Sequence, residues 1–541
     1  MTKYLLVAVS ILFSAYLSAQ YKSGIMIPDS SMAKNMDKSN PSVMMADDIT
    51  AEDLRSHLTV IAGDGFEGRE TGEPGNDRAA KYIADHFKNI GIAANPDLKN
   101  GYYQPVAFTF ESWNNAAMVV NGQKYRHLWD FLAFQDKNKN IGTVNIEKAV
   151  FLGYGIDDPK YSDYKRKRVK GKTIIIYAGE PMNASGNSRI TGSSEKSEWS
   201  TNINKKLEAA MNNGVETVMI ISDDIKSQLS ANRRQLLGSK VSLGDTSERP
   251  NYPNNIYIST TIAKEILGKK MSKVIKSRDR ITMKGKSRKV NLKTNVQLTL
   301  DKNVKSIVGQ NVLGYIEGTD KKDELVILSA HYDHLGKRGE SIYNGADDNG
   351  SGTTAVLEIA QTFADGLKKG IRPRRSMLFL LVTGEEKGLL GSAYYAERPI
   401  YPLAKTMVDI NVDMVGRVDD KYLSNPNYIY VIGSDRLSTD LHKINESVNQ
   451  EFTQLVMDYT YNSESDPNRY YFRSDHYNFA KNGIPAIFFF NGTHADYHQA
   501  SDTVEKINFE KMEQVTKHIY HLAFELANQE KAIVVDGEVK D

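Results

Sequence analysis

The stretch MLFLLVTGEEKG, residues 377–388, joins six apolar residues to a short turn and two adjacent glutamates. A strand without polar alternation has to be covered on both faces, so Met377 to Val382 is predicted to be a buried strand of a largely parallel sheet. Thr383 and Gly384 end the apolar run. Glu385 and Glu386 then place two like charges beside a core, where a carboxylate tends to take up a proton. A partner from elsewhere in the chain is needed to explain them.

Polar residues, mostly histidines and carboxylates, follow other apolar runs of the second half of the chain in the same way. These residues are His331, Asp333, His334, Asp347, Asp348, Asp413, His494, Asp496, Tyr497, His498 and Asp502. Open α/β sheets place their sites at the carboxyl ends of strands. Each residue alone could merely cap a loop or a helix, but four strand ends that all deliver imidazole or carboxylate groups are hard to attribute to chance. This thiol-free set suits a hydrolytic Zn²⁺ site, with Mn²⁺ or Co²⁺ as chemically plausible substitutes.

The fold class follows from the pattern of apolar residues. From Asn291 onward, apolar strands alternate with amphipathic helices, which is typical of an α/β domain. We therefore predict a mostly parallel central sheet flanked by helices. Before it, residues 76–90 share an apolar helical face that ends at Gly91. Thr50 and Asp53 have roughly the spacing of a capping box, which predicts the start of another helix.

The length of 541 residues exceeds one ordinary core and favours two or three domains. The stretch from 111 to 288 differs in composition from the sequence on either side, because it contains basic clusters and a polar loop. It is predicted to be a smaller α/β domain inserted into the main one. The predicted organisation is a signal peptide at 1–19, a flexible N-terminal arm at 20–48, the main domain at 49–110 and 289–530, the inserted domain at 111–288, and a C-terminal tail at 531–541.

The N-terminal residues predict export. A lysine at position 3 is followed by an apolar run, Tyr4 to Leu17, and by small residues before Gln20, which is the pattern of a secretory signal peptide. No second stretch reaches membrane-spanning length, and the absence of cysteine excludes disulfides and lipid-modified cysteine. A formal net charge of +2 gives no case for nucleic acid or an acidic membrane as partner. We expect a periplasmic or secreted protein, and the oligomeric state stays open.

Five motifs occur in order along the chain. They are His-x-Asp, Gly-Ala-Asp-Asp-Asn-Gly-Ser-Gly, Glu-Glu-x-Gly-Leu-x-Gly-Ser, Asp-Met-x-Gly, and a late Tyr-His with Asp-Thr downstream. Together they resemble the zinc exopeptidase family of the bacterial bi-zinc aminopeptidases and glutamate carboxypeptidase, over residues 49–528. The segments 150–155 and 169–175 resemble the protease-associated domain that part of this family contains.

The resemblance implies two Zn²⁺ ions per chain and assigns their ligands residue by residue. His331 and Asp413 would hold one ion, and Glu386 and His498 the other. Asp347 would bridge the two.

The same resemblance implies roles around the metals. Glu385 would be the general base, and Asp333 would orient the imidazole of His331. Tyr497, beside a ligand, would be an oxyanion donor, although a packing role fits it as well. Arg473, Asp475 and His476 resemble a family stretch near the substrate pocket and receive no role.

Three functions remain open at this point. The first is an aminopeptidase acting on peptides, and the second is a carboxypeptidase or dipeptidase on the same scaffold. The third is a binding protein that recognises its partner through the inserted domain, with an idle or structural metal site. The complete ligand set argues against an inactive relative such as the transferrin receptor. It also argues against the glutaminyl cyclase branch, which works with one zinc.

Overall fold

The computed structural model describes residues 24–28, 39–96, 98, 101–237, 240–244 and 251–539. The predicted signal peptide at 1–19 lies outside these residues. The chain forms two compact units, one of residues 1–107 and 308–541 and the other of residues 108–307. Both boundaries fall inside long strands, β2 (Tyr103–Val120) and β10 (Val290–Ile316). The predicted boundary at 288 differs from the one at 307 because β10 runs through this region without a break.

The first unit contains a large sheet with the strand order β1-β17-β16-β18-β15-β11-β14-β10. Besides β10, the strands of this sheet are β1 (Ile25–Met26), β11 (Lys321–His331), β14 (Arg375–Val382), β15 (Thr406–Val412), β16 (Tyr428–Ile432), β17 (Val456–Asp458) and β18 (Ala486–Phe490). Strand β11 is parallel to β14 and β15, and β15 is parallel to β18. The carboxyl ends of these four strands therefore meet at one edge of the sheet.

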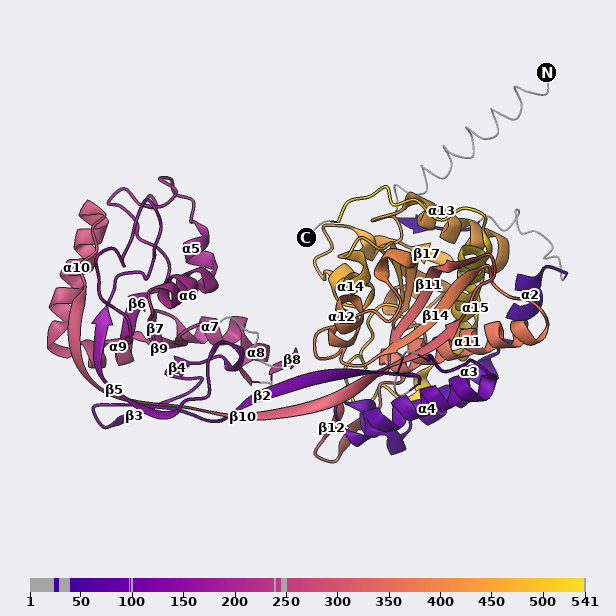
Figure 1. Cartoon of the computed structure of the whole chain (residues 1–541), viewed down its shortest axis with the longest axis horizontal. Coiled ribbons are helices and arrows are strands. Elements are labelled where there is room, and N and C mark those ends of the chain that lie inside the picture. Colours follow the sequence, from indigo (N-terminus) through magenta and orange to yellow (C-terminus); the bar gives the residue numbers. More distant parts are fainter. Residues whose placement is uncertain are drawn as a thin grey trace, which may run out of the picture. The chain divides into compact units, whose positions relative to one another are not determined.

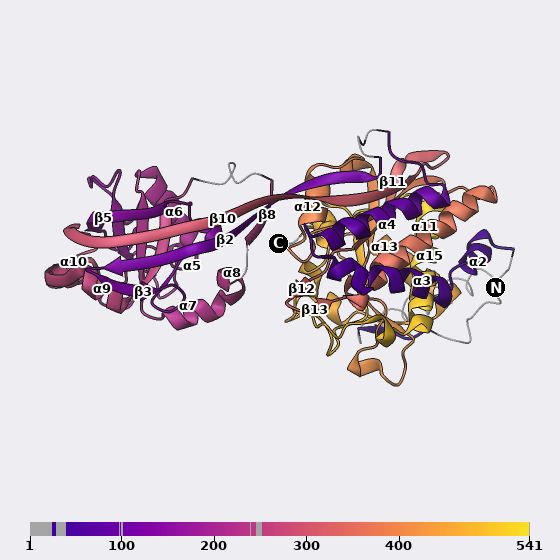
Figure 2. The same ribbon diagram turned by 90° about the horizontal axis from the view of Figure 1, so that it is seen from below.

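Helices cover both faces of this sheet (Figure 1). One layer consists of α3 (Ala51–Ile61), α4 (Pro74–Ile90), α11 (Gly352–Lys368) and α15 (Phe509–Asn528). Figure 2 shows α3, α4 and α11 side by side in that layer. The other face carries α12 (Leu390–Glu397) and α14 (His476–Ala480), while α13 (Thr439–Val448) lies near the end of the sheet. This arrangement confirms the predicted α/β class.

Strand β14 shows why the run from Met377 to Val382 needs no polar residue. Met377, Phe379 and Leu381 pack into the core beneath α3, α4, α11 and α15. Leu378, Leu380 and Val382 pack into the separate core on the opposite face. All six side chains are fully buried. Alternation still exists in this strand, but both faces meet apolar layers.

The helix signals of the sequence are confirmed. Thr50 Oγ1 accepts a hydrogen bond from the backbone N–H of Asp53 at 3.2 Å and caps α3. Helix α4 ends at Gly91, whose φ of 91° lies in the left-handed region that favours glycine.

The described parts of the predicted flexible arm are packed on the domain, which corrects that prediction, and the described part of the C-terminal tail also contacts the domain. β1 (Ile25–Met26) pairs with β17, and α2 (Pro41–Ala46) buries Met45 in the first core. In the tail, the backbone of Asp536 donates to Leu437 O at 3.0 Å. Short apolar and capping residues in these polar segments suffice to dock them on the domain.

The second unit has its own sheet and helices. Strands β5 (Gly142–Phe151), β6 (Thr173–Tyr177), β7 (Thr217–Ser222) and β9 (Asn254–Ser259) pair in parallel, and β5 is antiparallel to the first part of β10. Smaller strands are β3 (Gln123–Arg126), β4 (Phe131–Leu132) and β8 (Lys240–Leu243). The helices are α5 (Glu198–Thr201), α6 (Ile203–Asn212), α7 (Ile225–Ala231), α8 (Arg233–Leu237), α9 (Thr260–Leu267) and α10 (Met271–Lys284). The resemblance to a protease-associated domain stays a prediction.

Membrane spans were sought among the described residues, and no helix there combines the length and the apolar character that a bilayer crossing requires.

Phe379 tests the double burial of β14. Its ring lies 6.4 Å from that of Phe87 and 6.1 Å from that of Phe363, and the side chain is fully buried. We expect Phe379→Ala to lower the free energy of unfolding by about 3–5 kcal/mol, because it leaves a cavity between the sheet and its helices. Urea unfolding followed by circular dichroism measures this loss. The control Leu423→Ala, at a side chain that is 70% exposed, should change the value by less than about 0.5 kcal/mol. Equal effects would contradict the proposed layering.

Candidate metal centre

The candidate site lies at the edge where the parallel strands end. β11 ends at His331, and Asp413 follows β15 directly. Glu385 and Glu386 lie in the turn after β14. The turn Ala346–Ser351, before α11, adds the aspartates of the motif Gly-Ala-Asp-Asp. His498 belongs to the loop after β18. The common direction of these strands thus brings together residues that lie as far apart in the chain as His331 and His498.

The first cluster consists of His331, Asp348 and Asp413, with Glu385 beside it. His331 Nε2 lies 3.4 Å from Asp348 Oδ1 and 3.4 Å from Asp413 Oδ1. Glu385 Oε2 is farther from this nitrogen, at 4.0 Å. The other ring nitrogen, His331 Nδ1, lies 3.0 Å from the backbone oxygen of Asp333. A hydrogen bond there holds Nε2 toward the carboxylates.

The second cluster consists of Glu386, His498, His334 and again Asp348. Glu386 Oε1 lies 3.2 Å from His498 Nε2 and 3.1 Å from His334 Nδ1. Asp348 Oδ2 lies 2.9 Å from His498 Nε2. The two oxygens of Asp348 therefore face different clusters, so this carboxylate joins them.

The donors of both clusters fit divalent metal ions. Four donors placed tetrahedrally at about 2.0–2.1 Å from zinc lie roughly 3.3 Å apart, close to the separations in both clusters. Within the described part of the chain, the buried atoms Glu386 Oε1, Asp413 Oδ1 and both ring nitrogens of His334 have no hydrogen-bond partner. Buried polar atoms left in this way are costly unless something else binds them. A cation at each cluster would satisfy the two carboxylate oxygens and the Nδ1 of His334, which faces Glu386.

Asp347, the predicted bridge, does not belong to either cluster, and this corrects the sequence prediction. Its carboxylate accepts hydrogen bonds from the backbone N–H of Gly416 at 2.7 Å and from Asn491 Nδ2 at 3.1 Å. Its Oδ2 also lies 3.1 Å from His494 Nε2. Side chains of consecutive residues in this turn point in opposite directions. Asp348 therefore faces the clusters, while Asp347 accepts hydrogen bonds from the neighbouring loops.

Asp333 has a different task from the predicted one. Its Oδ1 lies 3.8 Å from His331 Nδ1, beyond hydrogen-bond distance. Its carboxylate accepts instead from the backbone N–H groups of Glu385 at 3.1 Å and Glu386 at 3.4 Å, and from Thr71 Oγ1 at 2.8 Å. Asp333 thus orients the turn of the two glutamates with its side chain and His331 with its backbone.

Arg69 holds together the two loops that carry His331 and Asp348. The guanidinium is fully buried and donates to the backbone oxygens of Tyr332 at 2.8 Å, Asn344 at 2.6 Å and Gly345 at 2.8 Å. Burial lowers its pKa to about 10, which still leaves it charged at neutral pH. A fixed positive charge therefore ties the segment after His331 to the turn before Asp348.

The two adjacent glutamates have opposite pKa shifts. Burial, with the charge of Glu386, raises the pKa of Glu385 well above its ordinary value. Burial also works to raise the pKa of Glu386, but His334 and His498 lower it well below the ordinary value. For His331, burial works to lower the pKa, yet Asp413 and Glu385 raise it well above the usual range. Environments that separate the pKa values of neighbouring groups are typical of acid–base sites.

A small cavity of about 30 Å³ opens at the first cluster. Glu385, Tyr497 and Arg473 line it, together with apolar side chains that include Phe488 and Phe490. Arg473 Nη2 donates to Tyr497 Oη at 3.3 Å. Burial, with the charge of Asp348, raises the pKa of Tyr497, so its hydroxyl keeps its proton.

Asp475 and His476 are buried behind the site. Asp475 accepts a hydrogen bond from Ser392 Oγ, and burial raises its pKa to about 7. The His476 ring stacks on Phe488 at 4.8 Å, and burial lowers its pKa to about 3. Both residues support the wall of the cavity, while their neighbour Ser474 donates to Asp413 Oδ2 at 2.7 Å.

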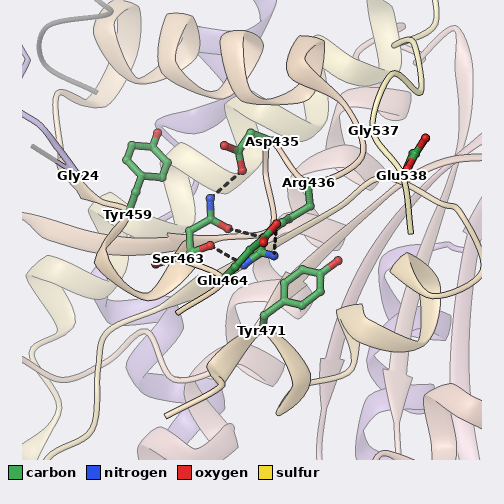
Figure 3. A pocket seen from close by; sticks show the side chains of 10 residues that line it. Gly24, Asp435, Arg436, Tyr459, Ser463, Glu464, Tyr471, Gly537 and Glu538 are labelled. Carbon is green, nitrogen blue, oxygen red and sulfur yellow. Dashed lines mark hydrogen bonds and ion pairs between the residues drawn. The ribbon is translucent and has the colours of Figure 1, made fainter. Parts of the chain in front are cut away.

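A larger pocket of about 410 Å³ shares no lining residue with the cavity at the clusters (Figure 3). Its central cation, Arg436, donates to the backbone oxygen of Asn462 and lies 3.8 Å from Glu464. The side chain also lies over the ring of Tyr471. Since its arginine is engaged and it lacks the convergent histidines, we assign the chemistry to the smaller cavity.

Paired histidine and carboxylate clusters at the carboxyl edge of an α/β sheet suit the chemistry of metal-dependent hydrolases. Residues 311–523 match the family model described as Peptidase family M28. This segment includes every residue of both clusters. This part of the chain is thus similar to peptidase family M28, and the resemblance inferred from the five motifs is confirmed for it.

Individual relatives are similar to the same part of the chain. A probable leucine aminopeptidase of Trichophyton verrucosum is 30% identical over 214 residues, which are 38% of this chain and 55% of that protein. Aminopeptidase YwaD of Bacillus subtilis is 26% identical over 230 residues, 41% of this chain and 46% of that protein. The chain thus spans about half the length of these relatives.

A solved structure is similar over nearly the whole chain. The aminopeptidase from Aneurinibacillus sp. strain AM-1 has a TM-score of 0.50 and 18% identity, and the likeness covers 92% of this chain and 98% of that one. At this identity the likeness supports the fold.

Sequence reasoning named His331, Asp413, Glu386 and His498 as ligands, and the structure brings all four to the clusters. It named His334, which follows directly after the motif His-x-Asp, without giving it a role, and it chose the wrong one of two adjacent aspartates. Arg69 gave no signal, because its partners are backbone oxygens far away in the chain.

The choice between the two aspartates can be tested with metal titrations. We expect Asp348→Ala to weaken the binding of both metal equivalents by more than about 100-fold, because one carboxylate serves both clusters; loss of an outer partner costs about 10–100-fold. Asp347→Asn keeps the shape of the side chain that links the loops, so this variant should retain both equivalents. Isothermal titration with Zn²⁺ and elemental analysis after gel filtration measure this. Loss of both ions in Asp347→Asn alone would restore the original assignment.

Proposed function

We propose that this protein is an exported aminopeptidase with two zinc ions, which removes amino-terminal residues from peptides. The observation that carries the proposal is the pair of clusters joined by Asp348 beside Glu385, within the segment that matches Peptidase family M28. Relatives described as aminopeptidases favour attack at the amino terminus. Export is supported by the signal-peptide pattern of residues 1–19.

The metal ligands in this proposal come from both clusters. His331 and Asp413 would hold one zinc ion, Glu386 and His498 the other, with Asp348 between them. Bound there, the ions would polarise the scissile carbonyl and lower the pKa of a water molecule. The remaining work falls to side chains of the chain itself.

Glu385 is the general base of the proposed reaction. It lines the cavity, whereas Glu386 is directed at His334 and His498. Bound cations nearby would favour its ionised form, which can accept a proton from the attacking water and pass it to the departing amine. Asp333 keeps the two glutamates in this division by binding both of their backbone N–H groups.

Tyr497 is the proposed donor to the developing oxyanion. Its ring stacks on His498 at 4.0 Å, which restrains a side chain that lines the cavity. A hydrogen bond aimed where negative charge develops lowers the barrier more than it stabilises the bound substrate. Arg473, hydrogen-bonded to this hydroxyl, holds its orientation.

One observation favours a second candidate, a carboxypeptidase. Arg473 lines the cavity and is exposed, so its guanidinium could receive a substrate carboxylate. The names of the relatives outweigh this observation, and the next experiment separates the two.

A digest of matched peptides identifies the end that is attacked. We expect free peptides and peptides with an amidated carboxyl end to lose amino-terminal residues one at a time, and N-acetylated peptides to resist. Mass spectrometry of a peptide library reads both the end and the side-chain preference. Ladders from the carboxyl end would establish the second candidate. A zinc-loaded protein that cleaves none of the peptides would favour the binding protein.

The two adjacent glutamates should behave differently on substitution. Glu385→Gln should keep both metal equivalents and lower kcat by about 100-fold to 10,000-fold, since it removes a base and not a ligand. Glu386→Gln should lose one equivalent, because it removes a donor of the second cluster. Zinc content and hydrolysis of aminoacyl anilides are measured on the same samples. If Glu385→Gln loses a full equivalent and Glu386→Gln does not, the two roles are reversed.

A further inference from the structure

We propose that His334 is a protein ligand of the second metal ion, so that the second cluster presents four donors and the first presents three. The proposal deepens the proposed function, because it rests on the same pair of clusters. The sequence places His334 directly after the His-x-Asp motif of β11. His498, Glu386 and Asp348 are the other three donors.

The environment of His334 points to a ligand. The residue is fully buried, and among the residues that the structure describes neither ring nitrogen has a hydrogen-bond partner. Its Nδ1 lies 3.1 Å from Glu386 Oε1 and 3.8 Å from Asp348 Oδ2. His334, Asp348 and Glu386 are close enough to share one ion. A buried imidazole with both nitrogens left over would otherwise be a considerable cost.

The approach of His334 Nδ1 to Glu386 Oε1 is not a hydrogen bond. Both atoms are without a hydrogen-bond partner in the described part of the chain although only 3.1 Å separates them, so their geometry is misaligned. Donor atoms that share a metal ion behave in this way, because their lone pairs aim at a common point beside the line that joins them. The separation is close to the roughly 3.3 Å between donors around tetrahedral zinc.

The backbone makes room for this ring. A Cβ atom at Gly345 would lie 2.4 Å from His334 Cδ2 and 2.5 Å from Cγ, so only glycine fits against the imidazole. The φ of Gly345 is 55°, which also favours glycine. The turn that carries Asp348 is thus shaped around the His334 ring. Packing accounts for the position of the ring, and metal ligation accounts for the unsatisfied Nδ1, which faces Glu386.

The proposal makes the two metal positions unequal. Sites with four protein donors are typically closed and structural, while sites with three keep an open position for chemistry. The first cluster has three donors in His331, Asp413 and Asp348, and it opens toward Glu385 and the cavity. We therefore expect the second position to bind zinc more tightly and to fill first.

Metal titration of His334→Ala provides the first test. We expect two equivalents in the wild type, and in the variant a loss of at least about 10-fold in affinity at the tighter of the two. His57→Ala is the matched control, because His57 Nε2 also lies 3.1 Å from a glutamate, Glu358, but outside both clusters. The control should keep both affinities. Circular dichroism verifies that each variant is folded.

Cobalt spectroscopy of His334→Cys gives a positive readout that does not depend on loss. The chain contains no cysteine, so any thiolate-to-cobalt charge-transfer band in the near ultraviolet has to come from position 334. A cysteine Sγ reaches about as far from the backbone as the Nδ1 that it replaces. We expect the band on addition of the first Co²⁺ equivalent, and no such band in the wild type or in His57→Cys.

Failure of this proposal is distinguishable from failure of the proposed function. A wild type that binds two zinc ions and cleaves peptides, with unchanged affinities in His334→Ala and no band in His334→Cys, overturns only the role of His334. A wild type that binds no zinc overturns both. Should neither variant fold, the crystal structure of the zinc-loaded wild type decides. A metal–Nδ1 distance of about 2.0–2.1 Å supports the proposal, and one beyond about 3 Å overturns it.

Discussion

The crowding of carboxylates at the carboxyl edge of the central sheet is the constraint around which this structure is built. Side by side and away from water, these groups repel one another, and burial favours their neutral forms. The fold reduces this cost by giving buried carboxylates fixed hydrogen-bond donors. The backbone N–H groups of Asp347 and Asp348 donate to Asp502, and those of Glu385 and Glu386 donate to Asp333.

Arg69 supplies the buried positive charge beneath this edge. It binds backbone oxygens and leaves the carboxylates of the clusters unpaired, so its charge acts on them through space while its hydrogen bonds hold the loops. An arginine paired directly with Asp348 or Glu386 would occupy the oxygens that a cation needs. The arrangement therefore stabilises the acidic loops and keeps their donors available, which is what a metal site requires.

Adjacent acidic side chains point in opposite directions and therefore have different roles in the site. Glu385 and Glu386 diverge, as do Asp347 and Asp348. In each pair one member serves the clusters directly. The other member faces the cavity in the case of Glu385, or the supporting loops in the case of Asp347. Two carboxylates in sequence are therefore not redundant, since each has its own partners.

Much of the fold and of the site could be read from the sequence, because short-range patterns encode them. The run Met377 to Val382 established a strand covered on both faces, and the order of the motifs placed histidines and carboxylates at one sheet edge. The docking of α2 and of the C-terminal tail could not be read in this way, because each contributes only a few buried atoms to cores formed by distant residues.

The sequence by itself determined which residue types meet at this site, since parallel strands bring their carboxyl ends together whatever the details of the loops. Only the tertiary structure decided which member of each adjacent pair faces inward. That choice depends on the backbone angles of irregular turns, such as φ −104° and ψ 98° at Asp348, and no periodicity reports them. For the same reason His334 gained its significance only in three dimensions, where Gly345 and Glu386 come to lie against its ring.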